Sequence, residues 1–208
     1  MVTILSKSKY LAGLQCPKLL WRLVHDKENI PSCSAGTQAI FDQGHDVGHL
    51  AQSLFPGGVS IPWEAPPKEK LRLTKEALPS GKPVYEATFS AGGAYAQVDI
   101  LVPQGERWDI VEVKSSTSAS DIHLHDLSLQ RHACEAAGLP VGRCMIAHLN
   151  NQYVRQGPVE LYAAIRDARL PLCDRHCVQP PNSTVSSSSS RPRNRTRVPA
   201  ALLPLRRC

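Results

Sequence analysis

The fold of this chain is decided by the stretch WDIVEVK at residues 108–114, together with the run VDI at residues 98–100. Side chains alternate across a β-strand, so Glu112 and Lys114 share one face and the intervening valines point to the other. Asp99 stands late in the strand that precedes them. Because buried charge without a partner is costly, charges on such apolar strands indicate a site that uses them.

Two interpretations of these charges are open. Glu112 and Lys114 could form an ion pair on an exposed strand face, where such pairs are common and contribute little to stability. Alternatively, Asp99 and Glu112 supply the hard oxygen ligands that Mg²⁺ prefers, and Lys114 holds a water molecule or a developing oxyanion. The second interpretation predicts hydrolysis of a phosphodiester.

The hydrophobic pattern predicts an α/β fold. Two short helices are expected across residues 3–25, and the elements that follow are helices at 37–54, 68–78 and 121–137 and strands at 83–90, 94–102, 108–114 and 141–149. Their core order, α-β-β-β-α-β, and the Val/Ile-rich central strands indicate a central mixed sheet covered by helices. We expect one domain at residues 1–164, with an N-terminal helical segment at 1–35 and a core at 36–150.

The positive charge of the chain is concentrated in its C-terminal part. Nine of the 24 basic residues and only two of the 18 acidic residues follow residue 165, so the net charge of +6 belongs to the tail and the rest is about neutral. A broad basic face on the folded part is therefore not expected. Residues 165–208 lack lysine and aromatic residues and are rich in Arg, Ser and Pro, which predicts a disordered tail. We consider it a possible product of out-of-frame translation.

The N-terminus shows no apolar segment of the kind found in a signal peptide, and no stretch approaches the roughly 18 apolar residues that a membrane span needs. We expect a cytoplasmic protein without membrane contact. Its seven cysteines are then expected to be reduced or to bind metal rather than to form disulfides.

The charges and the order of elements together resemble the PD-(D/E)XK nuclease core, and more narrowly its RecB-like branch, which includes the CRISPR-associated adaptation nucleases. Further segments are similar to a bacterial domain-of-unknown-function family with a RecB-like nuclease region: LSKSKYLAGLQCPKLLW, FPGG, EATF, VDIL, VEVKSSTS, HLHDLSLQ and NNQYVRQG. The resemblance covers roughly residues 3–162. It implies a restriction-endonuclease-like fold and a metal-dependent deoxyribonuclease.

The resemblance also implies a role for each site residue. Asp99, Glu112 and the Val113 carbonyl would bind Mg²⁺ or Mn²⁺. Lys114 would orient or deprotonate the attacking water, and Gln130 would position the catalytic groups or contact the DNA backbone. The implied partners are single- or double-stranded DNA and a helicase or second nuclease subunit.

Two positions depart from the RecB-like pattern. A histidine expected as a further metal ligand four residues after Gly44 is replaced by Gly48. His45 and His49 flank it, and His49 is preferred between the two, although a solvated helix histidine is the favoured interpretation. The tyrosine expected four residues after Gln130 is Cys134. This second departure weakens the expectation that the helix faces DNA, but it leaves the metal site unchanged.

Each of the other candidate residues has a structural interpretation and a functional one. Glu86 could reach the metal or be structural. His123, His125 and His132 are expected to be solvated rather than zinc ligands, because neighbours two apart on a helix face different ways. Some relatives carry an iron–sulfur cluster held by four cysteines; Cys16 matches the first ligand, and only Cys173, Cys177 and Cys208 remain for the others.

We expect no assembled cluster in this chain, so Cys16 would be a buried or free thiol. Two alternatives to a nuclease remain open at this point. One is a nucleic-acid-binding or assembly module that keeps the fold without cutting. The other is a truncated gene product without function.

Overall fold

The computed structural model describes residues 4–30, 35–160 and 164–169. Within them, seven strands form one mixed sheet in the order β2-β3-β4-β5-β6-β7, with β1 paired to β4 beside this path. The strands are β1 (Leu5–Ser6), β2 (Val59–Ser60), β3 (Val84–Ala91), β4 (Ala94–Gln104), β5 (Arg107–Lys114), β6 (Val141–Leu149) and β7 (Ile165–Arg169). The chain is therefore a mixed α/β protein with an open sheet, as the pattern predicted.

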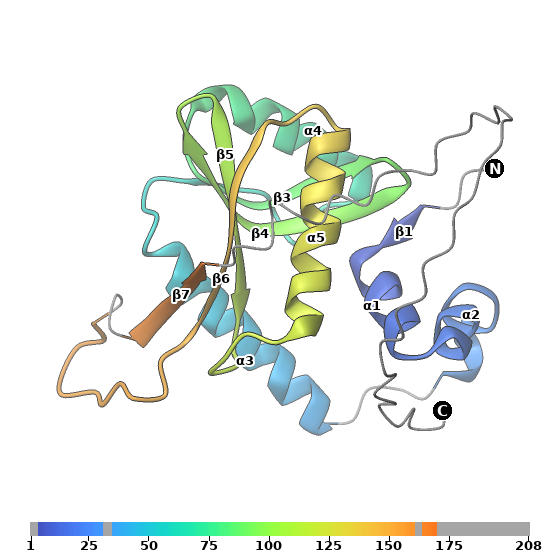
Figure 1. Cartoon of the computed structure of the whole chain (residues 1–208), viewed down its shortest axis with the longest axis horizontal. Coiled ribbons are helices and arrows are strands. Elements are labelled where there is room, and N and C mark those ends of the chain that lie inside the picture. The colour runs from blue at the N-terminus through green and yellow to red at the C-terminus, as the bar shows by residue number, and fades with distance from the viewer. Residues whose placement is uncertain (1–3, 31–34, 161–163, 170–208) are drawn as a thin grey trace, which may run out of the picture.

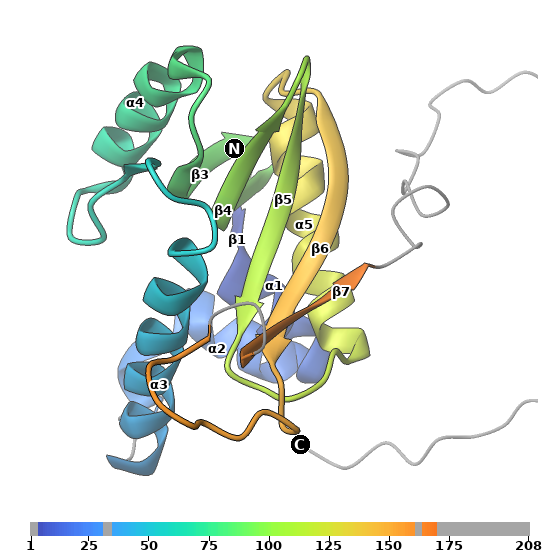
Figure 2. The same ribbon diagram turned by 90° about the vertical axis from the view of Figure 1, so that its left-hand side faces the viewer.

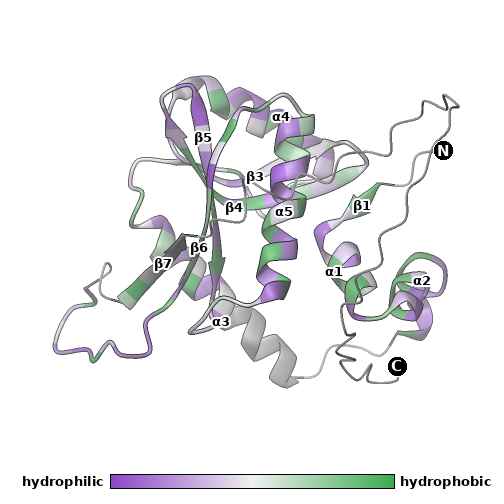
Figure 3. Ribbon diagram, in the orientation of Figure 1, coloured by the Kyte–Doolittle hydropathy of each residue, from purple (hydrophilic) through white to green (hydrophobic). Residues whose placement is uncertain are grey.

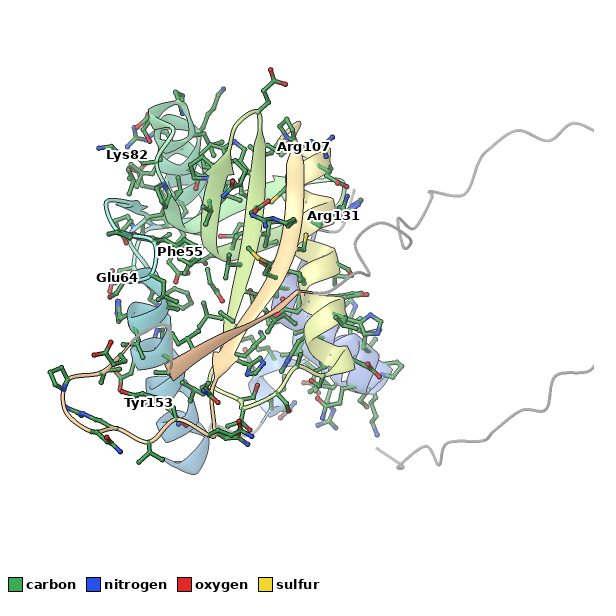
Figure 4. All side chains as sticks on the ribbon, turned by 60° about the vertical axis from the view of Figure 1, so that its left-hand side comes forward. Phe55, Glu64, Lys82, Arg107, Arg131 and Tyr153 are labelled. Carbon is green, nitrogen blue, oxygen red and sulfur yellow. The ribbon has the colours of Figure 1, made fainter. Side chains whose placement is uncertain are left out.

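Helices cover both faces of this sheet (Figures 1 and 2). They are α1 (Lys7–Gln15), α2 (Pro17–His25), α3 (Ala35–Gln52), α4 (Pro67–Ala77) and α5 (Asp121–Ala136). Leu127 and Ala133 of α5 belong to the larger apolar cluster, whereas Ala51 of α3 belongs to a second cluster on the opposite face. Phe55, just after α3, packs against this second cluster, and Arg131 lies on α5 on the other side of the sheet (Figure 4).

The hydropathy of the ribbons follows this layered arrangement. In Figure 3, green hydrophobic bands alternate with purple hydrophilic ones along α5, as expected for a helix with one buried face. The buried side chains of α5 include Leu127 and Ala133 but also the polar Asp126 and Gln130. A buried polar pair on the core side of a helix needs partners, and the sheet beneath α5 supplies them.

Local sequence signals account for most of the element boundaries. The β3–β4 hairpin turns at Gly92 and Gly93, both with positive φ, as a tight hairpin turn requires. Pro17 opens α2 at its first turn. At the end of α5, Gly138 adopts φ 85°, so the Leu139 N–H can bond back to the Cys134 carbonyl at 3.0 Å.

The structure differs from the sequence-based expectation at the sheet edges. The two-residue strands β1 and β2 are too short to leave a periodic signal. Residues Ile165–Arg169, expected to begin a disordered tail, instead form β7 antiparallel to β6, with Ile165 opposite Leu149. The expectation was wrong for these five residues because pairing with a sheet edge outweighs an unfavourable composition. Residues 170–208 lie outside the described part.

The regular alternation of side chains breaks at one place in β3 and β4. Val84 and Ala87, three apart, face the same apolar cluster, and so do Val98 and Leu101. The break in β3 coincides with Glu86, whose φ of 60° lies in the left-handed region. Glu86 and Asp99 lie opposite each other, between the paired residues Tyr85↔Ile100 and Ala87↔Val98. The sheet is thus kinked beside Asp99.

In the described part of the chain, no helix is long and apolar enough to cross a membrane.

Candidate functional site

The site lies where strands β4 and β5 separate, and we call this point the fork. The β4–β5 register runs from Gln104↔Arg107 to Ile100↔Val111. Beyond it, the N–H of Val113 donates to Asp99 Oδ2 at 2.7 Å instead of to a strand carbonyl. The beginning of β4 pairs with β1 in parallel, with Ser6 opposite Tyr95. Strand β1 thus delivers the next residue, Lys7, to the open side of the fork.

Six polar side chains meet there, and we call them the charged cluster: Lys7, Asp99, Glu112, Lys114, Asp126 and Gln130. Glu112 is their centre. Its Oε1 accepts hydrogen bonds from Lys7 Nζ at 2.7 Å and from Lys114 Nζ at 2.5 Å, and its Oε2 accepts one from Gln130 Nε2 at 2.5 Å. Both carboxylate oxygens are therefore engaged.

Helix α5 closes the cluster from above the sheet. Asp126 and Gln130 are one helical turn apart and point the same way, and they are bonded to each other at 3.1 Å. Asp126 Oδ2 accepts from Lys114 Nζ at 2.6 Å, and its Oδ1 lies 3.2 Å from Lys7 Nζ. Glu112, Asp126 and Gln130 are all but inaccessible, at 1%, 1% and 0% exposure.

Burial and mutual charge set the protonation of the carboxyls. Burial opposes ionisation of Glu112, but the ammonium groups of Lys7 and Lys114 outweigh it and hold its pKa well below the usual range. For Asp99, burial together with the negative charge of Glu112 raises the pKa well above its usual value. Burial and Glu112 likewise raise the pKa of Asp126. Environments that push neighbouring carboxyl pKa values apart are typical of functional sites.

The carboxyls around the two lysines favour the charged form of each lysine. Burial disfavours the Lys7 ammonium, but the charges of Glu112, Asp99 and Asp126 outweigh it, and the pKa of Lys7 is raised. The pKa of Lys114 is raised as well, because Glu112 and Asp126 outweigh its burial. Both lysines are therefore cations at any physiological pH.

A second polar chain leads away from the site. Glu86 accepts from Gln97 Nε2 at 2.8 Å, and Gln97 Oε1 accepts from Lys70 Nζ at 3.3 Å. Lys70 lies 4.6 Å from the ring centre of Trp63, which is exposed. Burial raises the pKa of Glu86, and the charges of Lys7 and Glu112 act on it in opposite directions. Glu86 therefore borders the cluster, and its positive φ marks a strained backbone there.

The structure brings together four of the residues predicted from sequence: Asp99, Glu112, Lys114 and Gln130. Val113 joins them through its N–H bond to Asp99. Sequence reasoning missed Asp126 and Lys7. Asp126 had a usable signal, since it stands four residues before Gln130 on the same predicted helix; Lys7 had none, because only the tertiary structure relates residues 105 positions apart.

The predicted histidine ligand is not part of the charged cluster. His49 is exposed on α3, which packs on the sheet face opposite to α5, and its backbone carbonyl accepts a hydrogen bond from Ser53 Oγ. His45 instead contacts the Trp63 ring, at 5.5 Å between ring centres. Cys16 is buried at the junction of α1 and α2. Cys173, Cys177 and Cys208 lie outside the described residues.

The donor set of the charged cluster fits a hard divalent cation. Its ionised form holds three carboxylates and two ammonium groups, which leaves an excess of negative charge for a cation to offset. The amide oxygen of Gln130 is buried without a hydrogen-bond partner. Within the described residues, however, no three His, Cys, Asp or Glu side chains already form a metal-holding group. Binding would therefore require rearrangement of the bonds made by Glu112.

Comparisons with known proteins add no family to this picture. No protein-family model matches the chain, and no curated protein matches it.

Proposed function

We propose that this chain is a divalent-metal-dependent nuclease that hydrolyses phosphodiester bonds in DNA, built on a restriction-endonuclease-like core of the RecB-like PD-(D/E)XK type. One observation carries the proposal. Asp99, Glu112, Lys114 and Gln130 were selected from sequence for nuclease chemistry, and they converge in one buried cluster at the fork of β4 and β5. The spacing of these four residues along the sequence does not by itself require that they meet in one cluster.

Each residue has a role that its contacts support. Asp99, Glu112 and the Val113 carbonyl would hold Mg²⁺ or Mn²⁺, which would supply Lewis-acid stabilisation of the charge on the phosphate. Lys114 orients the attacking water and offsets negative charge that develops on the phosphate oxygens. Asp126 holds Lys114 through a 2.6 Å ion pair, and Gln130 fixes Glu112 through Oε2.

The cluster also supports a second candidate function. Glu112 is already neutralised by two lysines, and an ion-pair network of this kind can be stable without a metal. A nucleic-acid-binding or assembly module that retains the nuclease fold is therefore the alternative. A helicase or second nuclease subunit is the partner we would look for in either case.

Cleavage of end-labelled linear DNA, single- and double-stranded, by the full chain tests the proposal. Reactions contain Mg²⁺, Mn²⁺ or EDTA, and compare the wild type with Lys114→Ala. The control is Lys82→Ala, which removes an exposed lysine at the turn before β3 (Figure 4). We expect metal-dependent cutting that falls by about 100-fold or more in Lys114→Ala and is unchanged in Lys82→Ala.

Two outcomes would contradict the proposal in different ways. Cutting that persists in Lys114→Ala would place the activity outside the charged cluster. Absence of both cutting and Mn²⁺ binding in a cooperatively folded protein would favour the binding or assembly module.

A further inference from the structure

The N-terminal segment contributes a cation to the site. Lys7 is the first residue of α1 and stands 105 positions before Glu112, yet its ammonium lies 2.7 Å from Glu112 Oε1. The same ammonium lies 3.2 Å from Asp126 Oδ1. The Lys7 side chain remains 26% exposed, so it enters the cluster from the solvent side.

The segment that carries Lys7 is attached to the core by the pairing of β1 with β4 and by part-buried packing of α1 on α5 and β4. Neither α1 nor α2 buries any of its side chains, and the two apolar clusters, taken over the described residues, include nothing from residues 4–25. Strand β1 pairs with β4 through two residues, and the Leu5 N–H donates to the Gly93 carbonyl at 2.8 Å. Tyr10 and His125 add a long contact of 3.4 Å. The Lys7 ion pairs therefore add a charged link to the docking of this segment on the core.

A divalent cation and the Lys7 ammonium would compete for the same oxygen atoms. Glu112 Oε1 already accepts from both Lys7 and Lys114, so a metal can bind this oxygen only if one donor withdraws. Lys114 and Gln130 are fixed on β5 and α5 in the core. Lys7 has the longest of the three bonds and the least anchored backbone, so it is the donor that can leave.

The charge of the cluster leads to the same conclusion. In the metal-bound site, where a divalent cation would favour the ionised forms of Asp99 and Asp126, the three carboxylates and two ammonium groups carry one net negative charge. A divalent cation added to this set gives a positive excess in a buried site, which is unfavourable. Replacement of one ammonium group by the divalent cation restores neutrality.

We propose that Lys7 is a tethered cation that occupies the carboxylate cluster in the metal-free protein, and that Mg²⁺ or Mn²⁺ binds by displacing it and loosening the β1–α1 segment. The inference rests on the metal site of the proposed function. It makes the N-terminal segment part of the metal-binding equilibrium, so that undocking of the segment and binding of the metal are one event.

Calorimetric titration of the full chain with MnCl₂ provides the first test. The variants are Lys7→Met, which keeps the length of the side chain without its charge, and Lys7→Arg, which keeps the charge. The control is Lys18→Met, which removes one exposed charge from the same segment. We expect Lys7→Met to bind Mn²⁺ about tenfold more tightly than the wild type, since a competing unit charge a few ångströms away is removed. Lys7→Arg and Lys18→Met should bind as the wild type does.

Hydrogen exchange of the wild-type protein gives a second readout that needs no variant. Addition of Mn²⁺ should accelerate exchange of the Leu5 amide, which bonds to Gly93 only while β1 is docked. Addition of EDTA should reverse the change. Exchange at the Thr88 amide, which is bonded to Thr74 Oγ1 in the core, should be unaffected and serves as the internal control.

The outcomes separate this inference from the proposed function. Equal or weaker Mn²⁺ binding by Lys7→Met, or an unchanged Leu5 exchange rate in metal-bound wild type, overturns the displacement while the metal site stands. Mn²⁺ binding by neither the wild type nor Lys7→Met overturns the metal site itself. Binding by Lys7→Met alone supports displacement in its strongest form.

Discussion

The Asp99 carboxylate accepts the backbone N–H of Val113 at 2.7 Å, so a side chain takes the place of a strand carbonyl where β4 and β5 separate. The bond holds Asp99 beside Glu112 although burial and the Glu112 charge both disfavour its ionised form. The same residue thus closes the sheet fork and has a carboxyl group whose ionised form is unfavourable. A trade-off between stability and function is the expected consequence.

Asp99→Asn should stabilise the metal-free protein at alkaline pH. The amide oxygen can still accept the Val113 N–H, while the costly charge is removed. Because the folded pKa of Asp99 is raised above its ordinary value of 3.8, the native state keeps a proton that the unfolded chain releases. Wild-type stability therefore falls as pH rises from the unfolded pKa through the folded one, and Asp99→Asn abolishes that component.

Urea unfolding at two pH values measures this effect. We expect Asp99→Asn to exceed the wild type by on the order of 1 kcal/mol at about pH 8, with the difference shrinking toward about pH 4. Mn²⁺ should stabilise the wild type more than the variant, which lacks a ligand charge. A variant less stable than the wild type at both pH values would show that Asp99 is ionised and well compensated in the metal-free fold.

Asp126→Asn should impair cleavage without unfolding the protein. Asp126 is bonded to both Lys114 and Gln130, so loss of its charge weakens the positioning of Lys114 while the shape of the side chain is kept. We expect kcat to fall by about 100-fold, as for other losses of preorganised charge. Glu135→Gln is the matched control, because Glu135 lies on the same helix and pairs with Arg131 at the surface. Similar rates for the two variants would remove Asp126 from the site.

Glu86→Gly should raise the free energy of unfolding. Glu86 adopts φ 60°, a left-handed conformation that costs a non-glycine residue about 1 kcal/mol and that glycine adopts freely. Thermal or urea unfolding should show a gain of about that size. Glu86→Gln separates the side-chain contribution, since it retains the strained backbone and the bond to Gln97. Equal stability of Glu86→Gly and the wild type would indicate that the side-chain contacts fully compensate the strain.

Gly92→Ala should be more destabilising than Gly93→Ala, although both glycines have positive φ. A Cβ at Gly92 would lie 2.6 Å from His132 Nε2 and 2.9 Å from Ala136 Cβ, whereas a Cβ at Gly93 meets nothing within 4 Å. Both variants carry a backbone penalty of about 1 kcal/mol. Gly92→Ala should lose roughly 1–3 kcal/mol more, because α5 must shift from the hairpin. Equal losses would mean that α5 moves at no cost.

Elements with a clear hydrophobic period could be predicted from sequence. The Val and Ile residues located β5 to within one residue of its observed start and at its observed end, and the glycines of the hairpin located the turn between β3 and β4. The strand period also placed Glu112 and Lys114 on one face. These features depend on residues close together in the chain, where local propensity and burial agree.

Features that arise from tertiary contacts were beyond the reach of the same reasoning. Strand β1 is two residues long and forms only against β4, and Lys7 reaches Glu112 as a consequence. The kink at Glu86 depends on a backbone conformation that glutamate rarely adopts. His49 was chosen from its distance to a glycine, but the packing of α3 determines the direction of its side chain. The composition of residues 165–208 predicted disorder, but β7 forms through a tertiary contact, its pairing with β6.

The origin of the charged cluster in the sequence has a consequence for the order in which the protein folds. Glu112 and Gln130 are 18 positions apart, whereas Lys7 must close a loop of 105 positions to reach Glu112. Short loops close at lower entropic cost, so β5 and α5 are expected to meet first. Lys7 leaves the ribosome early but docks late. During synthesis, we therefore expect Glu112 to meet Lys114 and Gln130 first, and the segment with Lys7 to complete the charge balance after the sheet has formed.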